Sequence, residues 1–309
     1  MFLSLHHIIY SLIPIILVVA FGWVAGSKKI IDNKHSGTLS TYVLYFSFPC
    51  ALFIQTATTK PSQLFNVKFV IAFWIGLMLM YFIGYLVQRK VLKRDVRESA
   101  QGAFVTSFPN MAFMGIPIFT ALFGLNSLIS IVVGNICSSL LMIPIVTILL
   151  SGSSEKQSVF KIVKNVIKKP LIFAPILGVI YSFCGFHLPD VASHSLNLIG
   201  ETTSGVSLFT MGLIMSSFVI KFNRYVVLSI ILKNVIHPLL MMAIILIFGI
   251  KGILAKEAIL LCAMPTATIT TMFSLKYEVL AEETTSVTIL GTIISLVTLT
   301  LFMLIVGIN

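Results

Sequence analysis

The chain has 309 residues, of which 58% are hydrophobic and only 10% are charged, and its net charge is +11. Soluble domains have about 25% charged residues, so this chain has too few charges to cover a soluble surface. Its lysines and arginines lie in short segments between apolar runs rather than in a basic patch, which argues against a nucleic-acid partner. The composition therefore predicts a multi-pass protein of the lipid bilayer.

Ten apolar runs follow one another along the chain, and each is long enough to cross a hydrocarbon core of about 30 Å. We expect transmembrane helices at 8–26, 36–55, 67–89, 98–120, 126–150, 170–186, 195–220, 225–248, 255–276 and 285–308. Small residues inside these runs, such as Gly212, are expected at close helix–helix contacts.

The connection at 151–169 divides the ten spans into five and five. We expect a first five-helix repeat at 1–150, a cytoplasmic linker at 151–169 and a second five-helix repeat at 170–309. Because each half has an odd number of spans, the second half enters the membrane from the opposite side, which would make the two halves an inverted repeat. The linker itself fits either an interfacial amphipathic helix or a solvated basic segment.

The lysines and arginines between the spans fall mostly on one side of the membrane. By the positive-inside rule, that side faces the cytoplasm. We therefore expect a protein of the cell (plasma) membrane with both termini outside.

Two prolines interrupt corresponding spans of the two halves. Pro109 lies in the middle of the fourth span, and Pro265 lies 156 residues later in the middle of the ninth. Proline removes a backbone donor, and in lipid the freed groups need partners unless the break lines a cavity. Half-helix N-termini at such a break favour an anion, and Asn110, Thr266 and Thr268 add polar side chains. For one span alone, a kink with threonine hydroxyls bonded to the local backbone is an equal alternative. The matched pair favours a shared binding site.

Ionisable residues inside spans are costly and mark candidate functional positions. Glu201 in the seventh span is a candidate site for coupling to H⁺ or Na⁺, with a carboxyl in a helix contact or near the outer interface as the alternative. Lys233 and His237 are four residues apart and share one face of the eighth span, where they could meet a carboxylate. For Lys233 the alternative is snorkelling toward the cytoplasmic end.

These residues resemble a known family. The stretch PNMAFMGIPI at 109–118 resembles the Asn-x-x-x-Met-Gly-Ile-Pro signature of the auxin efflux carrier family, which includes the plant PIN carriers and many bacterial permeases. The segments AMPTATITTMFSLKY at 263–277 and SFPCALF at 47–53 resemble elements of that family's ninth and second spans. The chain differs from the plant carriers at Phe108 and lacks their long central loop, which argues against auxin itself.

The resemblance implies an all-α membrane fold of ten helices in two inverted five-helix repeats, with broken helices 4 and 9 crossing at the substrate site. It implies a secondary active transporter that moves a small organic anion, such as a malate- or malonate-like carboxylate, by alternating access. An auxin-like weak-acid exporter or a passive anion channel is the alternative, and the chain could form a homodimer. The candidate substrate-binding residues are Pro109, Asn110, Met111, Gly115, Pro265, Thr266 and Thr268, with Glu201, Lys233 and His237 as coupling or charge partners.

Motifs of catalysis and metal binding are missing from the sequence. The four cysteines have no metal-binding spacing, and no H-E-x-x-H, G-x-S-x-G or phosphate-binding loop occurs. We therefore expect no enzyme activity, no cofactor and no bound metal other than a coupling ion.

Overall fold

The computed structural model describes residues 2–59, 66–124, 127–151, 160, 164, 167–186, 188–217 and 220–308. Throughout these residues the secondary structure is helical, and no strand forms beyond one isolated bridge. The expected all-α class is therefore confirmed. The two interpretations of the 151–169 linker fall largely on residues outside this description.

The helices of the first half follow the predicted spans. They are α1 (Phe2–Ser27), η1 (Asn33–His35), α2 (Ser36–Tyr42), η2 (Val43–Ser47), α3 (Phe48–Thr58), α5 (Val67–Leu86), η3 (Val87–Val91), α6 (Val96–Ser107), η4 (Met111–Gly115), α7 (Ile116–Phe123) and α8 (Leu128–Ser151). The five-residue segments η2, η3 and η4 are π-helical turns that continue their neighbouring helices. The fourth predicted span is thus two helices, α6 and η4–α7, separated by residues 108–110.

The helices of the second half also follow the predicted spans. They are α10 (Pro170–Phe183), α11 (Asp190–Gly200), α12 (Thr202–Met215), α13 (Arg224–Ile231), η6 (Leu232–Ile236), α14 (His237–Ile247), α15 (Ile253–Ala263), α16 (Thr268–Tyr277) and α17 (Ala281–Ile305). The ninth predicted span is again two helices, α15 and α16, separated by residues 264–267.

Each of the ten predicted ranges contains helix. Among the described residues, six segments are long and apolar enough to cross a membrane, and shorter apolar helices lie at Ile13–Ser27, Phe113–Phe123 and Pro170–Phe183. A multi-pass membrane protein is therefore confirmed, while the inverted relation of two five-helix repeats stays a prediction.

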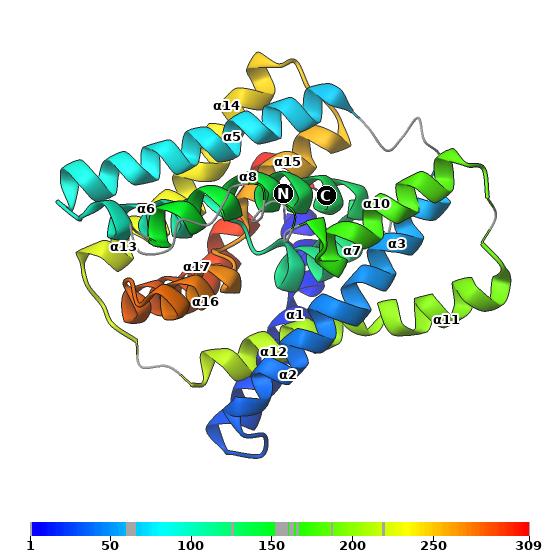
Figure 1. Ribbon diagram of the computed structural model, residues 1–309, viewed down its shortest axis with the longest axis horizontal. Helices are drawn as coiled ribbons and strands as arrows, with labels where there is room; N and C mark the ends of the chain where they lie inside the picture. Colours follow the sequence, from blue (N-terminus) through cyan, green and yellow to red (C-terminus); the bar gives the residue numbers. More distant parts are fainter. Residues whose placement is uncertain are drawn as a thin grey trace.

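Helices of the two halves lie side by side. In Figure 1, α10 runs along α3 and α1 packs across α12. The α1–α12 contact is close because Gly22 and Gly212 face the partner backbone. A Cβ on Gly212 would lie 1.9 Å from the Val19 carbonyl oxygen, and one on Gly22 would lie 1.9 Å from that of Phe209. The expected packing role of Gly212 is confirmed.

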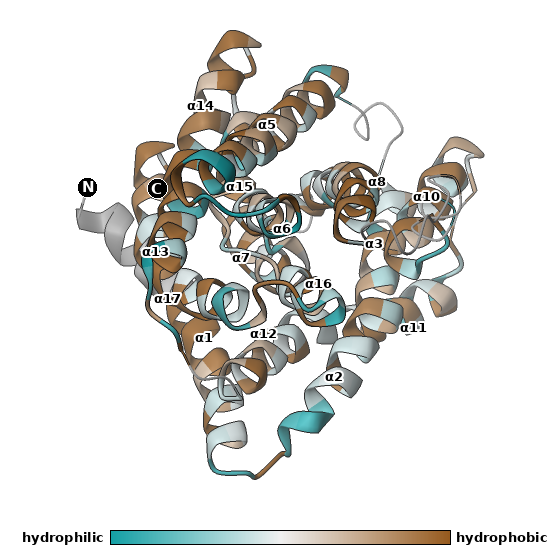
Figure 2. Cartoon of the chain, turned by 60° about the vertical axis from the view of Figure 1, so that its left-hand side comes forward, coloured by the Kyte–Doolittle hydropathy of each residue, from teal (hydrophilic) through white to brown (hydrophobic). Residues whose placement is uncertain are grey.

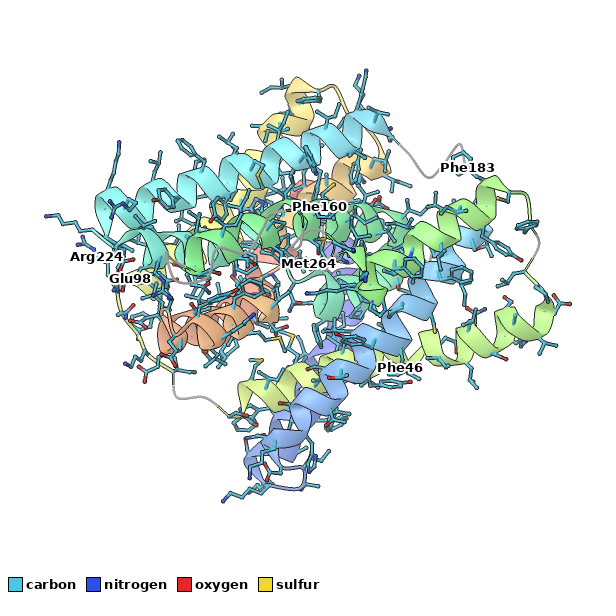
Figure 3. The ribbon with its side chains drawn as sticks, viewed as in Figure 1. Phe46, Glu98, Phe160, Phe183, Arg224 and Met264 are labelled. Carbon is cyan, nitrogen blue, oxygen red and sulfur yellow. The ribbon has the colours of Figure 1, made fainter. Side chains whose placement is uncertain are left out.

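The outer surface is apolar and much of the interior is polar. Figure 2 shows hydrophobic residues over α5, α14 and α10, with hydrophilic colour concentrated at the connections between helices. Phe46 and Phe183 are exposed, whereas Met264 is fully buried at the centre of the bundle (Figure 3). Buried hydroxyls such as that of Thr106 bond to carbonyls of their own helix. This distribution is expected when lipid surrounds the protein and offers no hydrogen bonds.

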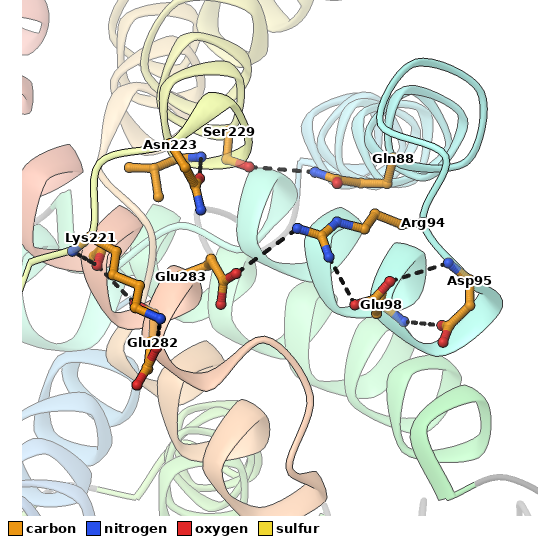
Figure 4. A network of polar contacts seen from close by, with 11 residues as sticks. Gln88, Arg94, Asp95, Glu98, Lys221, Asn223, Ser229, Glu282 and Glu283 are labelled. Carbon is orange, nitrogen blue, oxygen red and sulfur yellow. Dashed lines mark hydrogen bonds and ion pairs between the residues drawn. The ribbon is translucent and has the colours of Figure 1, made fainter.

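A polar network fixes the start of α6, the helix that leads into the first break. Asp95 and Glu98 form a capping box at its N-terminus, and the Arg94 guanidinium lies 3.0 Å from Glu98 and 3.9 Å from Glu283 of α17 (Figure 4). Lys221 pairs with Glu282 in the same region. Partly exposed pairs contribute about 0–1 kcal/mol each, so the network positions α6 against α17 more than it stabilises the fold.

Candidate functional site at the crossing of two broken helices

The two helix breaks lie against each other. Their backbones run antiparallel and exchange two hydrogen bonds: the Asn110 N–H donates to the Pro265 carbonyl (2.9 Å), and the Ala267 N–H donates to the Phe108 carbonyl (3.0 Å). These bonds form the isolated bridge between Pro109 and Thr266. Proline has no N–H to satisfy at these positions. Two segments more than 150 residues apart in sequence therefore meet at one point in the bundle.

Two helix N-termini point at this crossing. The segment η4–α7 begins at Met111 and α16 begins at Thr268, and no side chain caps either terminus. The first backbone N–H groups of a helix have no partner within the helix, and the helix dipole places partial positive charge there. An anion at the crossing would interact favourably with both termini.

Three carbonyls near the ends of α6 and α15 accept hydrogen bonds from side chains. The Thr266 hydroxyl donates to the Val105 carbonyl (2.8 Å), and the Ser107 hydroxyl donates to that of Ala103 (2.6 Å) in α6. At the end of α15, the Lys233 ammonium donates to the Cys262 carbonyl (2.7 Å). These three carbonyls therefore have donors within the protein.

A cavity of about 360 Å³ borders the crossing. That volume is in the range of small-molecule sites. Its walls come from α2, η2, η4, α8, α10 and α16, and most of the lining is apolar. The polar lining residues are Ser40, Thr41, Asn110, Asn135, Ser139, Thr268, Lys169 and Lys276.

Several cavity donors have no strong partner. The Ser40 hydroxyl and the Asn135 amide nitrogen are buried without a hydrogen bond to any described residue. The Asn110 side-chain nitrogen is only near the Met211 sulfur, at 3.9 Å. A buried unsatisfied polar group costs about 1–3 kcal/mol, and a solute with acceptor oxygens would recover that cost. Ser40 and Asn135 are not among the site residues predicted from the sequence, although a polar amide inside the fifth predicted span indicates a functional position.

The predicted substrate-binding residues divide into two groups. Pro109, Asn110, Met111 and Thr268 line the cavity. The other three build the crossing: the Pro265 carbonyl accepts from Asn110, the Thr266 hydroxyl bonds to α6, and the Gly115 N–H donates to the Asn110 carbonyl (3.1 Å). Substrate binding by these residues stays a prediction.

The predicted charge partners lie outside the cavity lining. Lys233 is 0% exposed, and its ammonium is 3.2 Å from Nδ1 of His237, so the predicted shared face is confirmed. The alternative prediction, that Lys233 extends toward the cytoplasmic end of its helix, is wrong, because its ammonium turns inward and donates to the Cys262 carbonyl at the end of α15. Glu201 is exposed at the bend between α11 and α12, so it is not the buried acid that the sequence suggested.

A different acid is buried. Glu257 in the first turns of α15 is 4% exposed and accepts a hydrogen bond from the Ser130 hydroxyl of α8. The sequence could have indicated this residue, since Glu257 falls near the start of the predicted ninth span. Within the part of the chain that the structure describes, no cluster of three His, Cys, Asp or Glu side chains could hold a metal ion.

Comparisons with known proteins give matches to transporters. Residues 7–303 match the model of a family described as membrane transport protein. The chain is 23% identical over 295 residues to an uncharacterized transporter YfdV of Escherichia coli, covering 92% of this chain and 94% of that one. It is 23% identical to a putative malonate transporter of Rhizobium meliloti, covering 89% and 88%. It is 20% identical to auxin efflux carrier component 8 of Arabidopsis thaliana, covering 96% of both chains.

Proposed function

The chain belongs to the membrane transport protein family and is a membrane transporter, and on that premise we propose that it is a secondary carrier of a small organic anion. The resemblance to auxin efflux carriers is confirmed by the family match and the named relatives. The names of the family and of these relatives are those of transporters, not of enzymes.

The observation that carries the proposal is the crossing beside the cavity. Two uncapped helix N-termini lie at one cavity, which Asn110, Ser40 and Asn135 also line. The donors of Ser40 and Asn135 are buried and have no partner among the described residues. Carboxylate oxygens accept hydrogen bonds from such donors, and bonds to charged groups contribute about 1.5–3 kcal/mol each. A carboxylate is therefore the substrate class that this site suits best, and a malonate-like dicarboxylate is the first candidate, since one relative has that name.

We propose that transport proceeds by alternating access between two inverted five-helix repeats, 1–150 and 170–309, joined by the 151–169 linker. The crossing would stay at the centre while one set of helices moves against the other. In this proposal both termini lie outside a plasma membrane, and the lysine-rich face, which includes Lys169 and Lys276, lies in the cytoplasm. A homodimer is compatible with this arrangement.

Reconstituted protein tests the proposal. We expect uptake of labelled malonate into proteoliposomes to saturate, and trapped unlabelled malonate to accelerate it by exchange. A carrier shows this acceleration because loaded carrier returns to the other side, whereas a channel does not. Flux that rises linearly with concentration would instead indicate the passive anion channel.

The same proteoliposomes also show which anion is carried and which ion, if any, drives its transport. Malate, propionate and an auxin-like weak acid compete with labelled malonate in parallel assays, which separates the dicarboxylate carrier from the weak-acid exporter. Imposed gradients of H⁺ or Na⁺ show which ion, if either, drives accumulation. Accumulation with neither gradient, at zero membrane potential and equal anion concentrations, would contradict secondary transport.

A further inference from the structure

Two lysines line the same cavity as the crossing, at its other end. Lys169 precedes α10, and Lys276 lies in the last turn of α16. Lys276 is eight residues beyond Thr268, which corresponds to about 12 Å along the helix axis. The cavity therefore reaches from the crossing to these two exposed lysines, and we call that end of it the mouth. Most of the wall between them is apolar.

The two lysines repel each other, and among the residues that the structure describes no ion pair joins either of them to an acid. Lys169 is exposed, but desolvation of its ammonium by the surrounding protein and the neighbouring charge of Lys276 lower its pKa from the ordinary value. The ion pairs among the described residues are formed by Arg94 and Lys221, not by this pair. Glu278 is close in sequence, but no ion pair joins it to either lysine.

The helix dipole does not favour the position of Lys169. It is the N-cap residue of α10, where the helix dipole disfavours a positive charge and where its side chain caps no backbone group. Lys276 is better placed, because it lies at the C-terminal end of α16 and over the ring of Tyr277 at 5.1 Å. The Arg97 guanidinium, bonded to the carbonyls of Tyr277 and Leu150, adds positive charge nearby. An anion at the mouth would relieve this repulsion.

We propose that Lys169 and Lys276 form an entry subsite for dianions, which captures a dicarboxylate at the mouth before it reaches the crossing. This inference rests on the proposed function and adds to it a preference for dianions over monoanions. A dianion interacts about twice as strongly with a given set of charges as a monoanion does. The subsite therefore favours dicarboxylates over monocarboxylates of similar size.

The test compares two double variants that each remove two positive charges from one face. The first is Lys169→Gln with Lys276→Gln. The matched control is Lys164→Gln with Lys168→Gln, because those lysines are exposed and do not line the cavity. KM and kcat are measured in proteoliposomes for malonate and for propionate, at low and high salt, after thermal unfolding has shown that each variant is folded.

We expect the mouth variant to raise the KM for malonate by roughly tenfold at low salt and that for propionate by roughly threefold, with kcat unchanged. The malonate KM of the mouth variant should depend less on salt than that of the wild type, because salt screens the attraction of the two lysines that the variant lacks. The control should change both KM values less than twofold, and the Lys169→Arg, Lys276→Arg variant should retain the wild-type preference. An unchanged malonate KM, or equal increases for both anions, would overturn the entry subsite.

A lipid phosphate could occupy the same two ammonium groups. The assay is therefore run in vesicles of phosphatidylcholine alone and of phosphatidylcholine with phosphatidylglycerol. The entry subsite predicts the same selective effect in both. An effect found only with phosphatidylglycerol would assign the lysines to a lipid headgroup and overturn the proposal. Failure of the proposed function is seen separately, as wild-type protein that transports neither anion.

Discussion

Replacing Asn110 with alanine is expected to lower kcat/KM for carboxylate transport by roughly 10- to 100-fold while the protein stays folded. Asn110 is buried at the crossing and lines the cavity. Its side chain has only a weak contact, 3.9 Å from the Met211 sulfur, so the fold loses little when it is removed. A hydrogen bond to a carboxylate contributes about 1.5–3 kcal/mol, which corresponds to the expected loss. The backbone bond from Asn110 to Pro265 remains, because alanine also has an N–H.

The control for this variant is Asn197→Ala, which removes the same side chain from an exposed position on α11. It should transport at the wild-type rate. Both proteins are compared by uptake into proteoliposomes and by thermal unfolding in detergent. Undiminished transport by folded Asn110→Ala protein would remove Asn110 from the site, whatever the function of the cavity.

Replacing Gly212 with valine is expected to prevent α1 and α12 from packing, with loss of most folded protein. Even the first side-chain carbon would lie 1.9 Å from the Val19 carbonyl oxygen and 2.8 Å from the Trp23 nitrogen. These are backbone atoms, so the two helices would have to separate. In a membrane, helices associate largely through such close van der Waals contact at small residues. Fluorescence-detected size-exclusion chromatography and thermal unfolding in detergent measure the effect.

The matched control lies on the same helix. Gly205 of α12 has no atom within 4 Å of an added Cβ, so Gly205→Ala should be neutral or stabilise the helix by about 0.5–1 kcal/mol. If Gly212→Val and Gly205→Ala have the same unfolding temperature, the close packing of α1 on α12 does not hold the fold together.

The sequence predicts the apolar helices of a multi-pass membrane protein and the two helix breaks, because both depend on strong local signals. A run of about 20 apolar residues is long enough to cross a membrane. Proline interrupts the hydrogen bonding of a helix interior, so Pro109 and Pro265 indicate breaks. The contact between the two breaks is a long-range feature. Only the correspondence of two prolines at an offset of 156 residues, supported by the family resemblance, indicates it.

The side chains of the site are less predictable, since burial and partners depend on packing between distant helices. Lys233 turns inward because the end of α15 presents a carbonyl to it, which no local pattern reveals. Glu201 falls inside the predicted seventh span and Glu257 near the start of the ninth, yet Glu201 is exposed and Glu257 is buried, so the predicted bounds do not decide which acid is buried. Lys169 and Lys276 are 107 residues apart and look like ordinary positive flanking residues until the cavity joins them.

The most direct test of the central claim is a structure determined with a bound carboxylate, chosen from mono- and dicarboxylates by the largest thermal shift. The crossing site predicts density for the carboxylate between residues 109–110 and 266–268, within hydrogen-bond distance of the Asn110 amide and of backbone N–H groups at the start of η4 or α16. Density for the anion elsewhere in the protein, with the crossing closed by side chains, would contradict the assignment of this crossing as the substrate site.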